Sequence, residues 1–220
     1  MAKSGTDPAA VSLPAGTGFA AGLGEAFSLD LNTGQGNYSV PIPLPDGVAG
    51  FAPRLKLEYA SAYGHGPFGL GWRLPLRELT RRLDPGVPAA EGPPSVGGLP
   101  RVERFLDGPT ELFPMPDGTW RPRLESTFQL YRREGDGWSI TERNGIRHEL
   151  GLSPGARVAD PDRPDRVQAW LLERSLDTSG NEIRYRYVHD GGSAYLEEVR
   201  YALYAVRLVY SPRPDARLNG

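Results

Sequence analysis

Glycine and proline interrupt this chain so often that a long helix is excluded. The 220 residues include 28 glycines and 22 prolines, and both types disfavour a helix interior, by about 1 and about 3 kcal/mol per position. No window of about 11 residues shows the three- and four-residue spacing of a helix face. Between the breaks, apolar and polar residues alternate, as in 27–31 and 55–59. This two-residue period predicts half-buried β-strands.

Turn residues separate the alternating segments at short intervals. Asn144-Gly145, between 138–141 and 146–150, is the strongest short hairpin signal. Strands are predicted at 27–31, 38–42, 55–59, 72–76, 104–106, 111–113, 128–132, 138–141, 146–150, 170–174, 183–188, 195–201 and 206–210. The sequence therefore predicts an all-β fold of many short antiparallel strands in hairpins, part of a β-sheet shell or sandwich, with little or no helix.

Two features divide the chain. Pro41, Pro43 and Pro45 cannot donate ladder hydrogen bonds, so we expect the strand at 38–42 to lie on a sheet edge or to leave the sheet early. Proline, glycine, alanine and serine dominate a predicted loop at 84–100, and 160–165 is a second predicted loop. We predict a disordered tail at 1–10, an N-terminal β region at 11–83 and a β-hairpin region at 101–220.

Composition excludes several classes of function. With 25 basic and 27 acidic residues the net charge is −2, so there is no overall field to attract nucleic acid or an anionic membrane. The absence of cysteine excludes disulfides, thiol catalysis and thiolate metal sites. No run of 18 apolar residues is present, and glycines interrupt 16–24, where a signal peptide would need an apolar stretch. We expect no nucleic-acid partner, no membrane insertion by this chain and no recognisable signal peptide.

A G-x-G-x-x-G pattern at 64–69 has Asp84 twenty residues beyond it, as in dinucleotide-binding proteins. Such a site needs a helix behind its last glycine, and a strand pattern follows here instead. We interpret the segment as a tight turn and expect no cofactor.

The three histidines, His65, His148 and His189, do not have the spacing of metal ligands. His148 shares a predicted strand face with Ile146 and Leu150, which favours a partly buried, hydrogen-bonded side chain. No G-x-S-x-G nucleophile elbow is present. We expect neither a metal site nor a catalytic triad.

Carboxylates supply no convincing site. Glu197 and Glu198 are adjacent on a predicted strand, so their side chains should point to opposite faces rather than form an acid/base pair. Asp160, Asp162 and Asp165 lack the spacing of a calcium-binding loop, and prolines and arginines lie among them. We interpret that segment as a solvated loop.

Four tryptophans, at 72, 120, 138 and 170, have two possible uses. They could form a sugar-stacking surface, or they could fill the core of a sheet packed on one face. Tyr185 and Tyr187 alternate with Arg184 and Arg186 as the second arrangement requires, which favours the core.

The first third of the chain resembles the SpvB/TcaC N-terminal family, at 11–18, 22–27, 33–36, 38–43 and 55–59. The strongest evidence is a signature of Gly66, Pro67, Phe68, Gly69, Gly71 and Trp72, similar to the family's N-G-P-F-G-x-G-W except that His65 replaces the asparagine. Residues 170–187 resemble the strand-turn-strand units of this family and of Rhs/YD-repeat proteins. The resemblance covers about residues 11–83 strongly and weakens beyond them.

This resemblance implies a module of the B component of bacterial ABC-type (Tc) toxin complexes, whose β-sheet shell encloses a cytotoxic polypeptide. The expected partners are the remainder of that shell and its cargo toxin, and the expected location is bacterial and extracellular, reached without a signal peptide. Virulence-type members carry an ADP-ribosyltransferase domain, but no arginine, S-T-S and E-x-E series is present in this chain. Whole B components are many times longer, so a fragment, a processed piece and a small stand-alone member all remain open.

The leading hypothesis is therefore a structural module, not an enzyme, that pairs its edge strands with the rest of an assembly. We expect an incomplete wall rather than a closed structure, because a chain of 24.0 kDa cannot enclose another folded protein. The alternative is a carbohydrate- or receptor-binding β-sandwich with exposed tryptophans. An enzyme with a cleft is a third possibility.

Overall fold

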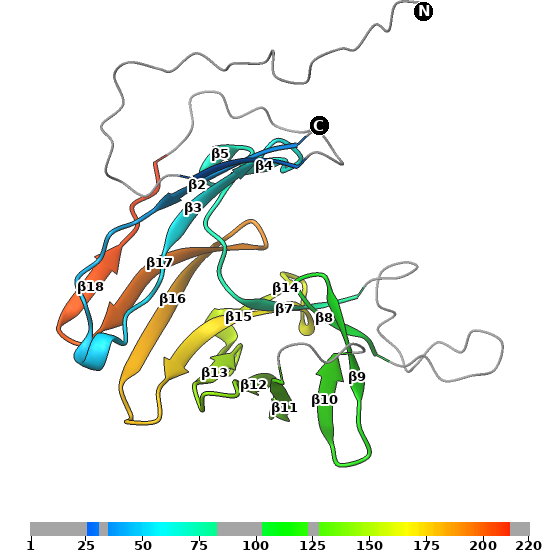
Figure 1. The fold of residues 1–220 in the computed structure, drawn as a ribbon. Helices are drawn as coiled ribbons and strands as arrows, with labels where there is room; N and C mark the ends of the chain where they lie inside the picture. The colour runs from blue at the N-terminus through cyan, green and yellow to red at the C-terminus, as the bar shows by residue number, and fades with distance from the viewer. Residues whose placement is uncertain (1–25, 31–34, 83–102, 123–127, 212–220) are drawn as a thin grey trace, which may run out of the picture.

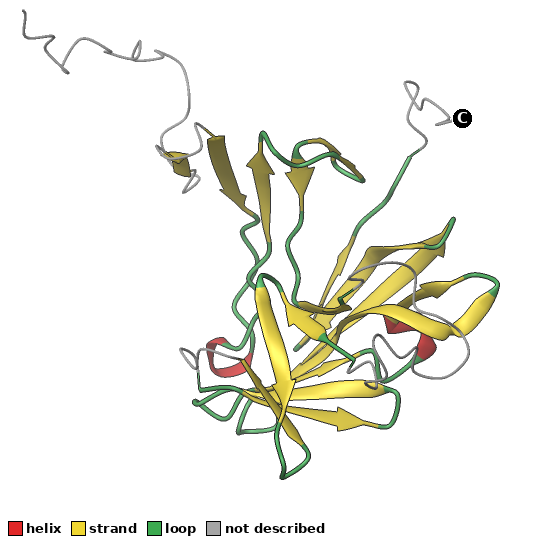
Figure 2. Cartoon of the chain, turned by 90° about the vertical axis from the view of Figure 1, so that its right-hand side faces the viewer, coloured by secondary structure: helices red, strands yellow, loops and turns green. Residues whose placement is uncertain are grey.

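The structure is a computed structural model that describes residues 26–30, 35–82, 103–122 and 128–211 (Figure 1). The predicted tail at 1–10 and the predicted loop at 84–100 lie outside these residues. Nearly all regular structure is β, with two short 3-10 turns, η1 (Val48–Gly50) and η2 (Pro154–Ala156) (Figure 2). The predicted all-β fold is thus confirmed.

The strands form three sheets. The first has the order β1-β2-β3-β6, and β4 and β5 form a separate two-stranded hairpin. These strands are β1 (Ala26–Asp30), β2 (Gln35–Pro41), β3 (Lys56–Ala60), β4 (His65–Gly66), β5 (Gly69–Leu70) and β6 (Trp72–Arg73). The large sheet comprises β7 (Glu78–Arg81), β8 (Phe105–Asp107), β9 (Thr110–Pro114), β10 (Thr119–Pro122), β11 (Leu130–Glu134), β12 (Gly137–Thr141), β13 (Arg147–Leu150), β14 (Arg157–Asp160), β15 (Arg163–Leu176), β16 (Glu182–Asp190), β17 (Ser193–Tyr201) and β18 (Tyr204–Arg207).

Eight strands of the large sheet close into a ring. From β7 to β13 each strand pairs with the next, β13 pairs with β15, and β15 returns to β7. The expectation of an incomplete wall is therefore wrong for this part of the chain. The sequence showed the hairpins, but the β13–β15 and β7–β15 pairings that close the ring join segments far apart in the chain.

The 14-residue β15 connects the ring to the rest of the molecule. Its first half pairs with β14 and β7, and its second half pairs with β13 and β16. From there β16, β17 and β18 continue as an open sheet, which we call the flank (Figure 1). The ring and the flank thus share one strand.

Apolar side chains fill the ring and the inner face of the flank. Phe105, Trp138 and Trp170 lie inside the ring at edge-to-face angles, with ring centroids 4.8–6.1 Å apart. On the flank, Val199 belongs to the same buried cluster as Leu55, and half-buried side chains from 42–52 and 74–76 pack against it. The Tyr201 hydroxyl donates a 2.9 Å hydrogen bond to the Pro45 carbonyl. The segment that leaves β2 therefore covers the inner face of the flank.

Several predicted boundaries need correction. The strand at 38–42 is not an edge strand, because β1 and β3 pair with its two sides, but it ends at Pro41, as the alternative prediction required. The loop at 160–165 is a tight turn, and β15 already begins at Arg163. The strand at 72–76 stops at Arg73, after which the chain crosses to the large sheet.

Candidate functional site

The signature segment (66–72) makes a tight hairpin followed by a second turn. β4 pairs with β5, and Gly69 and Gly71 have φ angles of +112° and +79°, which side-chain-bearing residues rarely adopt. A Cβ on Gly71 would lie 2.4 Å from the Cε2 atom of Tyr59. The next element is β6 rather than a helix, so the segment lacks the helix N-terminus that a dinucleotide site needs.

Aromatic contacts attach this segment on both sides. The Trp72 ring lies 5.4 Å from Tyr59 and 6.1 Å from Tyr38, centroid to centroid, within the first sheet. At the tip, the Phe68 ring lies 6.2 Å from Tyr210, which is itself 5.6 Å from Tyr195 of β17. The signature segment therefore joins the first sheet to the flank.

The flank ends in a strand with a free edge. β17 pairs with one side of β18, and no strand of the described ranges pairs with its other side. The Leu208 N–H donates to the Glu197 carbonyl, so by antiparallel alternation the N–H groups of Ala205 and Arg207 point to the free edge. Such a row of unpaired backbone groups is a template for another strand.

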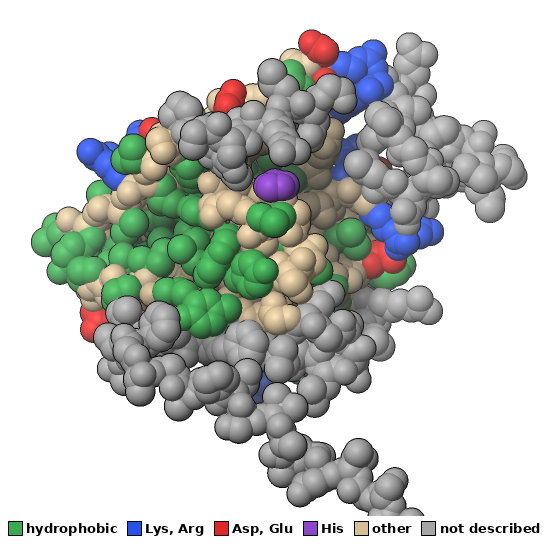
Figure 3. All heavy atoms as spheres, turned by 90° about the horizontal axis from the view of Figure 1, so that it is seen from above, with side chains coloured by type: hydrophobic (Ala, Val, Ile, Leu, Met, Phe, Trp, Pro, Cys, Tyr) green, Lys and Arg blue, Asp and Glu red, His purple; other side chains and the backbone are tan. Residues whose placement is uncertain are grey.

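Exposed apolar side chains accompany this edge. Leu203 and Val209 are 99% and 93% exposed, and Tyr204 and Tyr210 are also exposed. Seen from above, hydrophobic side chains gather over a broad part of the surface on the side that carries the signature segment (Figure 3). A surface of this composition is typical of protein contacts.

The outer face of the flank is charged and borders an open groove of about 510 Å³. Arg174, Arg184 and Arg200 lie directly opposite one another on β15, β16 and β17. Each has a carboxylate partner: Glu149 at 2.6 Å, Glu182, and Glu198 at 2.5 Å, respectively. The hydrogen bond that Arg174 donates to Glu149 raises the pKa of Arg174. The arginines therefore form a balanced polar face.

The prediction that the Glu197 and Glu198 side chains point to opposite faces is wrong. Both carboxylates contact Arg186, at 3.0 and 3.8 Å, because a register shift between Arg186 and Tyr187 makes room for an extra residue on β17. Hydrogen bonds from Arg200 and then Arg207 lower the pKa of Glu198. A carboxyl with a lowered pKa is a poor general acid near neutral pH.

A polar cluster lies at one end of the ring, and no sequence pattern predicted it. Arg77 Nη2 lies 2.6 Å from Asp107 Oδ2, which also accepts a 2.8 Å hydrogen bond from the Tyr131 hydroxyl, and Gln129 contacts both Arg77 and Tyr131. Burial, followed by the charge of Asp107, raises the pKa of Tyr131. Together with His148, Ser175 and Glu142, these groups come from five segments of the chain, so no local motif could have revealed them. They bond to one another, so the cluster ties strands together.

His148 belongs to the same cluster. Its Nδ1 lies 2.9 Å from Ser175 Oγ and its Nε2 lies 3.1 Å from Glu142 Oε1, which confirms the predicted partly buried, hydrogen-bonded histidine. Burial, and next the positive charge of Arg77, lowers its pKa. The other two histidines lie elsewhere, His65 in β4 and His189 at 2.9 Å from the Gly155 carbonyl. Within the described ranges no three His, Asp or Glu side chains group as metal ligands would, and no helix is long and apolar enough to cross a bilayer.

The tryptophans are mainly core residues, as predicted. Trp138 and Trp170 are 0% and 1% exposed, and Trp120 is half-buried beside Phe105. Trp72 is half-buried under the tyrosines of the first sheet. Tyr185 is buried, whereas Arg184 and Arg186 are exposed on the opposite face of β16.

Comparison with known proteins gives a consistent result. Residues 31–95 and 118–203 match the SpvB family, described as Salmonella virulence plasmid 65kDa B protein. Mono(ADP-ribosyl)transferases SpvB from Salmonella typhimurium (strain 14028s / SGSC 2262) and Salmonella dublin are 34% identical over 194 residues, which cover 77% of this chain and 32% of each relative. The chain thus spans about a third of the length of the curated relatives it matches.

Two solved structures share the fold. The TcdB2–TccC3 crystal structure matches with a TM-score of 0.69 and 29% identity, covering 90% of this chain and 11% of that chain. The N-terminal domain of the effector protein SpvB from Salmonella typhimurium strain LT2 matches with a TM-score of 0.57 and 25% identity, covering 78% of this chain and 66% of that chain. Both structures are similar to this chain in amino-acid sequence as well as in fold.

The relatives correct one prediction. From the sequence we expect the chain not to be an enzyme, but its curated relatives are named mono(ADP-ribosyl)transferases. That prediction rested only on motifs inside these 220 residues, which match about a third of the length of each relative. The family model and the relatives agree over more than half of the sequence, so this chain belongs to the SpvB family.

Proposed function

We propose that this chain is a structural module of a toxin-complex β-shell, which helps to encapsulate or deliver a cytotoxic polypeptide through strand pairing and protein contacts. The free edge of β18 is the observation that carries this proposal. Its outward N–H groups and the exposed Leu203 and Val209 suit a neighbouring strand. The partners would be the remaining shell and its cargo, and the module would be secreted with them.

In this proposal the signature residues Gly66, Pro67, Phe68, Gly69, Gly71 and Trp72 hold the first sheet against the flank. The ring contacts of Trp72 and Phe68, on opposite sides of the segment, support this assignment. A rigid connection matters because β18 can pair with a neighbouring strand only if its free edge keeps a fixed direction.

The turn after β15 supports a relationship to YD-repeat units. Asp177 Oδ1 accepts hydrogen bonds from the N–H groups of Ser179 and Asn181, at 2.9 and 2.8 Å, and Gly180 has a φ angle of +84°. The Asn181 side-chain amide also donates to Asp177. This side-chain hydrogen bond, followed by those from the backbone N–H groups, lowers the pKa of Asp177. The D-x-x-G-N pattern thus closes a hairpin, and a series of such hairpins would extend a wall.

The carbohydrate-binding alternative receives less support. A sugar-stacking surface needs an exposed tryptophan face, and the four tryptophans are buried or half-buried.

A chimaera tests the proposal. We would replace the matching segment of TcdB2 with this chain and measure association with TccC3 by size-exclusion chromatography. We expect a complex of the size formed by unmodified TcdB2 and TccC3. The same chimaera with Ala205→Pro should lose it, because proline removes an outward N–H. Equal assembly of the two chimaeras would contradict edge pairing, and failure of both would contradict the module.

A further inference from the structure

Arg133 of β11 lies at the end of the ring opposite the polar cluster. Its guanidinium carbon is 4.8 Å from the ring centroid of Trp138, 4.9 Å from that of Trp170 and 5.6 Å from that of Phe105. Arg81 of β7 reaches two of the same rings, at 5.7 and 6.0 Å. Two arginines from different strands therefore lie close to the same cluster of aromatic rings.

Some hydrogen-bond donors at the Arg133 end of the ring have no acceptor. Within the described ranges Arg133 has ring contacts but no hydrogen bond or ion pair to a carboxylate or carbonyl. Arg81 bonds Glu103 at 3.0 Å through Nη1, but its buried Nε has no acceptor. The Nε1 of Trp138, a residue that is 0% exposed, also has none. These two N–H groups are buried, whereas Arg133 is exposed, so a complementary ligand must offer oxygen acceptors to the Arg133 guanidinium.

The shape of the guanidinium determines how Arg133 can bind. Its N–H groups lie in one plane, in a fixed fork that matches the two oxygens of a carboxylate. Arg133 is exposed although its guanidinium lies near three aromatic rings. Its paired N–H groups can therefore donate to the two oxygens of a planar acceptor.

The local charge favours an acceptor with a single negative charge. Arg81, Arg133 and Arg157 face the carboxylates of Glu103 and Asp136. Asp136 Oδ2 lies 3.2 Å from Arg157 Nη1, and Arg157 also donates to the carbonyls of Gly151 and Leu152. Among these five described side chains one positive charge is left over, which a carboxylate would neutralise and a doubly charged phosphate would exceed.

We infer that the Arg133 end of the ring binds the carboxylate of a glutamate or aspartate side chain in a partner polypeptide. This inference rests on the proposed function for the nature of the partner, because a shell module contacts other polypeptide. It uses a surface remote from the β18 edge, so the free edge and the Arg133 end can be tested separately.

Nuclear magnetic resonance of the full chain tests the inference. The four tryptophans give four indole N–H signals, and the Trp138→Phe variant identifies the signal of Trp138. The probe is a hexaglutamate peptide, with sodium chloride at matched ionic strength as the reference. We expect a saturable shift of the Trp138 signal with the peptide and none with the salt.

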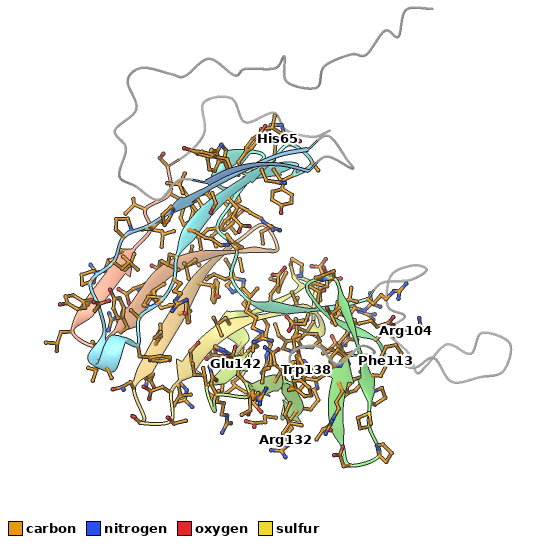
Figure 4. The ribbon with its side chains drawn as sticks, viewed as in Figure 1. His65, Arg104, Phe113, Arg132, Trp138 and Glu142 are labelled. Atoms are coloured by element: carbon orange, nitrogen blue, oxygen red, sulfur yellow. The ribbon has the colours of Figure 1, made fainter. Side chains whose placement is uncertain are left out.

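Two variants separate a built site from general attraction. Arg133→Gln should weaken peptide binding by about tenfold or more, since a charge-assisted contact is lost. Arg132→Gln, on the face of β11 that points away from Trp138 (Figure 4), should leave the binding constant unchanged. Arg133→Lys keeps the charge without the planar fork and should bind between the two.

Three results would overturn the inference. They are no saturable shift in the unmodified chain, the same shift with salt alone, or equal weakening by Arg132→Gln and Arg133→Gln. A dispersed backbone amide spectrum in the absence of peptide, like that of the unmodified chain, would show that each variant is folded. Loss of TcdB2-type assembly with peptide binding retained would contradict the proposed function and leave this site standing.

Discussion

The ring and the flank use the same kind of strand in opposite ways. In the ring every strand has a partner on both sides, and its interior holds Trp138, Ile140 and Leu150, all 0% exposed. In the flank, strand pairing stops at β18, and the turn before it exposes Leu203 almost completely. Within the described ranges the ring is closed by its own strands, whereas the flank ends in the free edge of β18.

This difference separates stability from assembly within one domain. A closed ring leaves no backbone edge, so it resists unwanted pairing and provides a rigid base. The open flank shares β15 with that base, so its free edge is held in a fixed direction. We therefore expect substitutions in the ring to change unfolding, and substitutions at β18 to change association.

The largest expected effect is in the ring. Trp138→Ala should lower the free energy of unfolding by about 3–5 kcal/mol, because it leaves a large cavity among packed rings. Leu203→Ala in the flank, at a side chain that is 99% exposed, should change it by less than about 0.5 kcal/mol. Urea unfolding followed by tyrosine fluorescence measures both. Similar losses in the two variants would remove the distinction between ring and flank.

The signature segment should be the next most sensitive. Gly71→Ala should cost about 1–3 kcal/mol from the positive φ angle and more from the 2.4 Å approach to Tyr59. In Gly69→Ala the strained φ remains, but the nearest atom to the new Cβ is 4.0 Å away, so the loss should be smaller. Thermal unfolding ranks the two, and a larger loss for Gly69→Ala would contradict the described packing.

Proline scanning of β18 distinguishes its two sides. Val206→Pro should lose about 1 kcal/mol or more, since it removes a donor to β17. Ala205→Pro removes an N–H that points to the free edge, so its unfolding midpoint should fall less. A larger loss for Ala205→Pro would mean that the register assigned to the hairpin is wrong.

The smallest effect concerns pH. Burial and Arg77 hold the pKa of His148 below its usual value, so folding favours the neutral ring. The stability from this preference is complete above the unfolded-state pKa of about 6.5 and is lost as pH falls through that value toward the lower folded-state pKa. His148→Gln should therefore lose less stability than the unmodified chain between pH 7.5 and pH 5, measured by urea midpoints; equal losses would contradict it.

How far the sequence predicts this structure depends on the range of each interaction. Alternation and turn residues are local, so the hairpins, the early end of β2 at Pro41 and the buried tryptophans follow from them. Ring closure depends on β15 pairing with β7 and β13, and the polar cluster around Arg77 combines five segments. Contacts between distant segments have no local pattern. The carboxylates on Arg186 were misassigned for another reason, because strict alternation along a strand does not allow for the bulge in the β16–β17 hairpin.

Hydrogen exchange at single amides tests the central claim, that the free edge of β18 is completed by other polypeptide. The measurement compares Ala205 and Arg207 with the amides of β12, in the isolated chain and in the TcdB2 chimaera bound to TccC3. We predict fast exchange of Ala205 and Arg207 in the isolated chain, slow exchange in the complex, and slow exchange of β12 in both. Protection of Ala205 and Arg207 in the isolated chain, or continued fast exchange in the complex, would contradict the account.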